Sequence, residues 1–289
     1  MFYLFYAFVW LIAWMPLRAL YLLSDIMYLI VYYLVGYRKK VVRMNLSNSF
    51  PQHSAASLGK IERAFYRHFC DVFVETLYEM HCSEKEIKKR MVFINIDKAL
   101  AEYDKGRSSL LMTAHYGNWE WTSSFSLWLP SDKPLYGVYK KLSSKNFNQF
   151  MCDLRMKFTG LNVEKDDLLR KLIELKRDGK LAMFGMISDQ TPPRISIHYW
   201  TTFLNQDTAI LTGTETLAKK LNLPVFYGKI TRVKRGYYTC EFIPIAIEPK
   251  ETAEFEITDK YIRLLEEQIL SAPEYWLWTH KRWKHKRQK

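Results

Sequence analysis

The residues best suited to acid–base chemistry in this chain are a histidine and a glutamate five positions apart, His115 and Glu120. An apolar run over 109–112 leads to the histidine, and a Gly-Asn break that can start a helix lies between the two. On such a strand-to-helix turn, the carboxylate can accept a hydrogen bond from one imidazole nitrogen and leave the other basic. We interpret the pair as a general base and its partner, acting on an attacking hydroxyl. The isolated spacing also fits a core histidine bound to a backbone carbonyl.

Polar residues after two other apolar runs are further candidates for the site. Asp189 and Gln190 follow the run 181–187, at the strand end where open α/β sheets bind their ligands, although turn residues are also ordinary there. Lys140 and Lys141 follow the run 135–139, and Arg155 lies in the next expected helix. These cations could face a phosphate or a developing oxyanion, or could form a solvated basic face.

Aromatic and cationic residues alternate over 275–284, a segment that includes His280 and Arg282. Such a segment can stack on single-stranded nucleic acid or lie in a lipid headgroup layer. Glycine-rich or β-barrel surroundings, which would favour nucleic acid, are missing from the sequence. It also contains no phosphate-binding loop, dinucleotide fingerprint, serine elbow or zinc-protease motif, and its four cysteines are scattered without zinc-ligand spacing.

The chain has 289 residues and a formal net charge of +13, which indicates an anionic partner such as a membrane surface, a phosphorylated substrate or an acidic carrier protein. Much of the aromatic content, 16% in all, lies in the first 37 residues and near 275–284, which favours membrane over nucleic acid.

The N-terminal stretch is apolar enough to enter a membrane. Residues 2–17 carry no charge, and a helix continued to Leu23 would be about 33 Å long, enough to span. The second apolar stretch, 26–35, is too short to cross and is expected to lie at the interface. Cations over 38–43 place the rest of the chain on the cytoplasmic side. We therefore expect a membrane anchor over 1–37 and one domain over 38–289.

Strands alternate with helices after residue 106, which is typical of an α/β fold with a mixed, mostly parallel sheet and helices on both faces. The expected strands are 109–114, 135–139, 181–187, 225–231 and 237–244, with a further short strand near 93–96. The expected helices are 58–80, 118–129, 145–158, 166–177, 209–221 and 258–270. The segment 225–244 is expected to form an antiparallel hairpin.

Three features together resemble the lipid A biosynthesis acyltransferases, the late lauroyl/myristoyl transferase family related to the glycerolipid acyltransferases. These are the N-terminal apolar helix, the motif His-Tyr-Gly-Asn-Trp-Glu over 115–120, and the Asp189-Gln190 pair with the closing segment 278–284. The resemblance covers nearly the whole chain, and its core motif is far more specific than a bare histidine–glutamate spacing. It implies a glycerol-3-phosphate acyltransferase-like fold.

The resemblance also implies a reaction and a location. A fatty acyl group would pass from an acyl carrier protein or coenzyme A thioester, the co-substrate, to a hydroxyl of a membrane lipid, most simply a lipid A precursor. No cofactor, metal or nucleic acid is expected. The enzyme would be a single-pass protein of the bacterial inner membrane with its catalytic domain on the cytoplasmic side. Another acceptor, such as a lysophospholipid, aminolipid or glycolipid, and a non-catalytic membrane lipid- or carrier-binding protein are the alternatives.

Site roles carry over position by position. His115 and Glu120 would form the catalytic pair, and the oxyanion would meet backbone N–H groups near Gly117 or a cation such as Arg155. Substrate contacts are expected from the following residues: Asn118, Trp119, Lys140, Arg155, Asp189, Gln190, His280 and Arg282. Aromatic candidates for an acyl groove are Trp119, Trp121, Phe125 and Trp128. The chain departs from the family pattern at Lys140, where arginine is common, and over 200–208, where an expected proline- and glycine-containing pattern is missing.

Overall fold

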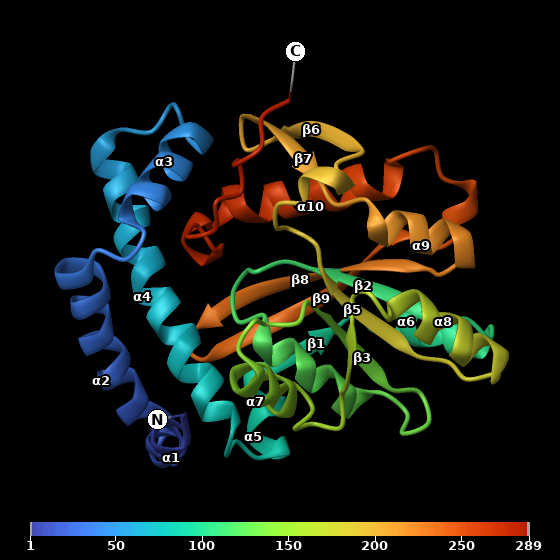
Figure 1. Cartoon of the computed structure of the whole chain (residues 1–289), viewed down its shortest axis with the longest axis horizontal. Coiled ribbons are helices and arrows are strands. Elements are labelled where there is room, and N and C mark those ends of the chain that lie inside the picture. Colours follow the sequence, from blue (N-terminus) through green and yellow to red (C-terminus); the bar gives the residue numbers. More distant parts are fainter. Residues whose placement is uncertain (1, 288–289) are drawn as a thin grey trace.

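A seven-stranded sheet forms the centre of the computed structural model, which describes residues 2–287 (Figure 1). In spatial order its strands are β1 (Met91–Ile94), β9 (Tyr237–Ala246), β8 (Val225–Lys234), β2 (Ser109–Thr113), β5 (Met183–Ile187), β3 (Leu135–Tyr139) and β4 (Leu161–Glu164). Neighbouring strands are parallel except β8 and β9, which form the predicted antiparallel hairpin. The predicted α/β class with a mixed, mostly parallel sheet is confirmed.

Helices cover the sheet on both sides (Figure 1). Their bounds are α3 Lys39–Ser49, α4 Ala55–Glu79, α5 Glu84–Arg90, α6 Asp97–Asp104, α7 Lys145–Arg155, α8 Leu168–Arg177, α9 Gly213–Leu221 and α10 Glu256–Ser271. In the view of Figure 1, α9 and α10 lie above the sheet and α5 and α7 below it. The long helix α4 runs along one side of the molecule, between α2 and the rest of the domain.

The register of β2 and β5 decides where the polar residues after them lie. Thr113 and Ile187 are paired at the carboxyl ends of these two parallel strands. The chain therefore leaves both strands at the same edge of the sheet, which brings His115 beside Asp189 although 74 residues separate them.

The helix expected over 118–129 is a 3₁₀-helix over Glu120–Trp128 instead. Hydroxyl side chains explain the difference, because each donates to the carbonyl three residues before it: Thr122 to Trp119 at 2.6 Å, and Ser124 to Trp121 at 2.7 Å. Such bonds occupy carbonyls that would serve an α-helix and favour the tighter turn.

The N-terminal helix expected to run from Phe2 to Leu23 is broken in two. Helix α1 (Phe2–Ala13) ends before Pro16, and α2 (Leu17–Tyr28) begins after it, because proline disfavours helix in the residue before it. Helix α2 continues through a π-helical turn over Leu29–Val35. Among the described residues, Leu17–Val35 is the one helical stretch long and apolar enough to cross a membrane. The bounds predicted for the spanning helix, 2–23, were therefore wrong.

Helix α2 is bound to α4 by polar contacts as well as apolar ones. Its buried residues include Leu20 and Ser24, and the Ser24 hydroxyl donates to Asp71 at 2.8 Å. Arg235, from the β8–β9 turn, bridges Asp25 of α2 at 2.7 Å and also binds Asp71. Helix α2 is therefore part of the folded domain along its length.

Three short strands, β4, β6 and β7, were not predicted from the sequence. Strands β6 (Tyr199–Phe203) and β7 (Gln206–Ile210) form a separate antiparallel hairpin, and β4 pairs with β3. The hairpin turn places Leu204 and Asn205 at φ of 49° and 61°, as a type I′ turn requires. The helix expected over 209–221 consequently starts only at Gly213.

Candidate active site

His115 lies at the carboxyl edge of the sheet with Asp189 as its partner. Nδ1 of His115 lies 2.7 Å from Asp189 Oδ1, and the His115 backbone N–H donates to Oδ2 at 3.0 Å. Burial alone would raise the pKa of the Asp189 carboxyl, but the charge and hydrogen bonds of His115 have a larger opposite effect. The pKa of Asp189 therefore lies below its ordinary value. An ionised Asp189 must accept from Nδ1–H, which leaves the lone pair on Nε2.

The expectation that Glu120 orients the imidazole was wrong in its geometry. Glu120 instead forms a two-pronged ion pair with Arg155 of α7, in which Nε and Nη2 each donate at 2.9 Å. Trp119 Nε1 also donates to Glu120 at 3.1 Å. Burial raises the pKa of Glu120, yet Arg155 and, to a smaller extent, His115 bring it below its ordinary value. The carboxylate therefore stays charged beside the imidazole without binding it.

Gln190 contacts the second ring nitrogen of His115. Its side-chain amide nitrogen is 3.2 Å from His115 Nε2 and can donate to the lone pair there. A substrate hydroxyl that uses Nε2 as a base must therefore displace this amide. Sequence reasoning placed Gln190 at the site, and the structure brings it directly to the basic nitrogen.

His280 supports the loop that follows Asp189. Its Nε2 accepts from the backbone N–H of Thr191 at 3.1 Å, and the Thr191 hydroxyl donates to the Arg282 carbonyl at 2.7 Å. Burial lowers the pKa of His280 to about 4, so the ring is neutral at pH 7 and offers no charge to a phosphate. We infer a positioning role for His280 in place of the substrate contact expected from the sequence.

Arg282 is almost completely buried, with 1% of its surface exposed. One Nη2–H donates to the Ala209 carbonyl at 2.8 Å, while Nε and Nη1 have no partner among the described residues. Burial lowers the pKa of Arg282 to about 10, although the negative charge of Asp189 acts to raise it. The guanidinium is a buried countercharge for Asp189, and its burial removes it from direct substrate contact.

The segment around 275–278 closes the site from the C-terminal side. Trp276 Nε1 donates to Asp189 Oδ2 at 2.9 Å. The backbone N–H of Leu277 donates to the His115 carbonyl at 3.0 Å, and the Gly117 N–H donates to the Tyr275 carbonyl at 2.9 Å. The last bond occupies the Gly117 N–H, which is one of the backbone groups near Gly117 that the sequence suggested as oxyanion donors.

The remaining predicted residues divide between site and scaffold. Trp119 is partly exposed, and its ring lies edge-on to the His115 ring with centroids 5.3 Å apart. Trp121 and Phe125, proposed as acyl-groove residues, are fully buried in the core. Asn118 is also fully buried, and Lys140 lies exposed after β3. Of the aromatic candidates, Trp119 is the one that the structure brings to His115.

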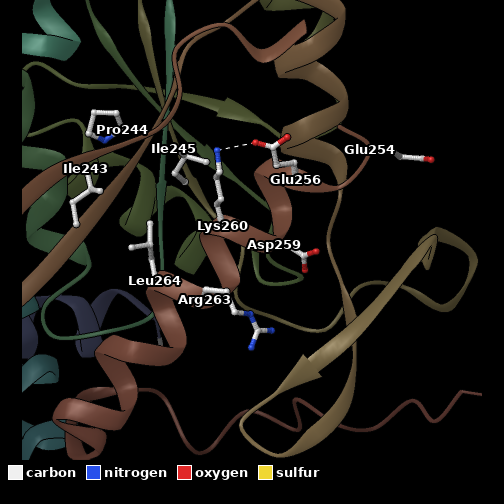
Figure 2. Close-up of a pocket in the computed structure, with 9 residues that line it drawn as sticks. All are labelled: Ile243, Pro244, Ile245, Glu254, Glu256, Asp259, Lys260, Arg263 and Leu264. Carbon is white, nitrogen blue, oxygen red and sulfur yellow. Dashed lines mark ion pairs between the residues drawn. The ribbon is translucent and has the colours of Figure 1, made fainter. Parts of the chain in front are cut away.

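A cavity of about 620 Å³ lies away from these residues, between β9 and α10 (Figure 2). Its walls are Ile243–Ile245 together with Glu254, Glu256, Asp259, Lys260, Arg263 and Leu264. The strand register places this end of β9 beside Val225, which pairs with Leu110 near the start of β2. The cavity is therefore at the opposite end of the central strands from His115.

Comparison with known proteins identifies the family. The family model described as bacterial lipid A biosynthesis acyltransferase matches residues 1–285. The chain belongs to this family. It is 22% identical over 249 residues to the lipid A biosynthesis palmitoleoyltransferase of Escherichia coli (strain K12), covering 86% of this chain and 79% of the relative. A lipid A biosynthesis acyltransferase of Shigella flexneri matches with the same identity and coverage.

Membership confirms the resemblance read from the sequence and makes this protein an acyltransferase of lipid A biosynthesis, an enzyme of a membrane-associated family. Within that family fold, the His115–Asp189 pair and the Glu120–Arg155 pair meet at one edge of the sheet. Sequence reasoning named all four residues but paired His115 with Glu120. The signal that could have corrected this is the parallel register of two buried strands that both end in a polar residue.

Proposed function

We propose that this lipid A biosynthesis acyltransferase moves a fatty acyl group from an acyl carrier protein or coenzyme A thioester to a hydroxyl of a lipid A precursor. The observation that supports it best is an imidazole with Nδ1 bound by a buried carboxylate and Nε2 contacted by the side-chain amide of Gln190, which a substrate hydroxyl can displace. That arrangement suits removal of a proton from a hydroxyl. The net charge of +13 suits an acidic carrier and a phosphorylated lipid.

The proposed reaction needs no covalent enzyme intermediate, because a thioester is already activated. Nε2 of His115 takes the hydroxyl proton as the oxygen attacks the thioester carbonyl. The tetrahedral intermediate then expels the thiolate, which receives that proton from the imidazolium. Ester and free thiol are the products, and His115 returns to its starting state.

Charge stabilisation falls to Arg155 in this proposal. Nε and one Nη2–H bind Glu120, and the remaining N–H groups of the guanidinium are available to the oxyanion. Glu120 then acts by fixing the planar fork of Arg155 beside His115, and Trp119 offers an apolar surface for the start of the acyl chain. Asp189 and Gln190 act at the imidazole, and Lys140, exposed after β3, meets anionic groups of carrier or lipid.

The location in this proposal is the cytoplasmic side of the bacterial inner membrane, with residues 1–37 as the membrane-associated part and 38–289 as the catalytic part. Apolar side chains such as Leu22, Leu29 and Leu34 are 67%, 54% and 80% exposed on the side of α2 and its extension that faces away from α4. A face of this kind is suited to lipid. The polar bonds between α2 and α4 hold α2 against the domain. They therefore favour an arrangement in which α2 lies along the membrane surface together with the domain, rather than one in which it spans the membrane separately.

Mass spectrometry of lipid extracts tests the function directly. Cells that lack the gene should lose one acyl chain from lipid A, and the wild-type gene should restore it while His115→Ala should not. Purified enzyme with acyl carrier protein and coenzyme A thioesters in parallel would identify the donor. Unchanged lipid A with an altered phospholipid or aminolipid profile would move the acceptor to another lipid. A His115→Ala enzyme with the wild-type rate would refute the mechanism.

A further inference from the structure

Glu75 is a fully buried carboxylate near the C-terminal end of α4, with 0% of its surface exposed. Three side chains from three different parts of the fold donate to it. Tyr21 of α2 binds Oε1 at 2.7 Å, while Asn118 and Tyr238 of β9 each bind Oε2 at 2.8 Å. An acid buried at this depth is costly unless its oxygens are satisfied, and here both are.

Asn118 transmits the position of Glu75 to the catalytic turn. Its Nδ2 donates to Glu75, and its Oδ1 accepts the backbone N–H of Trp121 at 3.1 Å. The Trp121 indole N–H also donates to the Glu75 carbonyl at 3.1 Å. The Glu75 residue therefore holds the chain on both sides of Glu120, which in turn holds Arg155.

The same helix fixes the turn nearer to the base. His68 lies about two turns before Glu75, and its Nε2 is 3.2 Å from the carbonyl of Gly117, two residues after His115. Burial lowers the pKa of His68 to about 3, so the ring is neutral and Nε2–H donates to this carbonyl. Two side chains of α4 thus define the path of the backbone between the base and Glu120.

Tyr21 connects this network to the helix with the lipid-suited face. Glu75 is one hydrogen bond from α2 and one hydrogen bond from the catalytic turn. Ser24, one turn further along α2, makes a bond of similar length to Asp71, which makes no direct hydrogen bond to the catalytic turn and reaches it only through Arg232 and His68. The chain therefore offers a matched pair of contacts at one interface, of which the Tyr21 contact has the shorter route to the site.

We infer that Glu75 is a positioning residue for acyl transfer, which holds the catalytic turn through Asn118 and is itself held by Tyr21 of α2. The helix that faces lipid is, on this inference, part of the scaffold of the active site. The inference rests on the proposed function, because it requires that the turn with His115 and Glu120 carries the reaction.

Substitutions at Glu75 separate hydrogen-bond geometry from fold stability. Glu75→Leu keeps the volume but leaves Asn118 without its acceptor, and a displaced turn should lower kcat at least about 30-fold with KM for the acyl thioester within about twofold. Glu75→Gln can still accept from Asn118 and donate to the Tyr21 oxygen, so it should recover most of that loss. A role in fold stability alone would lower the melting temperature of Glu75→Leu without this change in kcat per folded enzyme.

Tyr21→Phe and Ser24→Ala provide the test if Glu75→Leu does not fold. Each removes one hydrogen bond between α2 and α4, and we expect Tyr21→Phe to lower kcat about fivefold while Ser24→Ala changes it less than about twofold. Equal kcat values for the two variants would overturn the inference, as would a wild-type kcat in folded Glu75→Leu. His115→Ala, assayed in parallel, distinguishes failure of the proposed function from failure of the positioning role. Activity in His115→Ala would refute the proposed function. An inactive His115→Ala together with a wild-type kcat in Tyr21→Phe would refute only the positioning role.

Discussion

Asp189 binds His115 at two points, with Oδ1 2.7 Å from Nδ1 of the ring and Oδ2 3.0 Å from the backbone nitrogen. The carboxylate thus fixes both the ring orientation and the strand end from which the ring projects. Trp276 donates a third hydrogen bond, so Asp189 itself has little freedom to move. The arrangement fixes the tautomer as well, because an ionised acceptor at Nδ1 requires the proton there.

Asp189→Asn should lower kcat by about 10³-fold without unfolding the enzyme, because an amide cannot accept at both of the atoms that Asp189 serves. The measurement is the initial rate of acyl transfer, with circular dichroism as the check on folding. Asp178→Asn, at an exposed acid after α8, is the matched control and should keep the wild-type rate. A rate for Asp189→Asn within about threefold of wild type would exclude this pair as the source of the base.

Arg155→Met should destabilise the protein by about 3 kcal/mol, because Glu120, with 11% of its side chain exposed, loses the cation that compensates its burial. The double variant Arg155→Met/Glu120→Gln should regain part of this stability but no activity. Urea unfolding and acyl transfer on the same preparations measure the two effects. The exposed pair of Arg170 and Asp167 is the control, and Arg170→Met should leave the unfolding midpoint unchanged. Recovery of activity in the double variant would show that the pair is only structural.

Glu75 should make the stability of the protein depend on pH near neutrality. Burial raises its pKa to about 7, while the hydrogen bonds from Tyr21, Tyr238 and Asn118 oppose this and the charge of Asp71 adds to it. The ordinary value is 4.5, so the folded state holds a proton here that the unfolded state loses between these two values. The stabilisation is complete below about pH 4.5 and is lost as the pH rises through about 7, a change of roughly 3 kcal/mol.

Comparison with Glu75→Gln isolates this effect from other groups. His68 has the opposite sign, because its lowered pKa gives stability that is present above its ordinary value and lost as the pH falls toward about 3. Urea unfolding of wild type and Glu75→Gln between pH 5 and 8 should therefore give a difference in unfolding free energy that favours wild type less as the pH rises. Parallel curves over this range would contradict the assignment.

Leu22→Glu/Leu34→Glu should weaken binding to phospholipid vesicles at least tenfold, because each leucine loses about 1.5 kcal/mol or more of apolar burial. Both side chains lie on the exposed face of α2 and its π-helical extension. Co-sedimentation with phospholipid vesicles measures the change. Ile173→Glu, at a 52% exposed position on α8, is the control for an added charge elsewhere. Equal loss in both variants would show that α2 is not the membrane-facing element.

The central strands other than β4, the hairpin over 225–244 and most helices were predictable because each is a local pattern of apolar residues or turn residues. The 3₁₀-helix after Glu120 was not, since its cause is a set of hydroxyl groups that compete for backbone carbonyls. At the site, local spacing pointed to Glu120, but the partner of His115 comes from a strand 74 residues later. Glu75 gave no signal at all, because a glutamate in a helical pattern reads as a solvent-facing residue until the packing of α4 is known.

The contacts of the segment 275–282 with the catalytic turn determine how the site can be lost. The Leu277 N–H binds the His115 carbonyl, and Asn45 of α3 donates to the carbonyls of Trp278 and His280. Helix α3, the catalytic turn and this segment are thus joined by bonds between chain regions far apart in sequence. Local opening of any one of them would break the site. As denaturant is added, we therefore expect activity to be lost at the same point as the protection of the His115 and Leu277 amides against hydrogen exchange, and not earlier. The active site is then as cooperative as the fold itself.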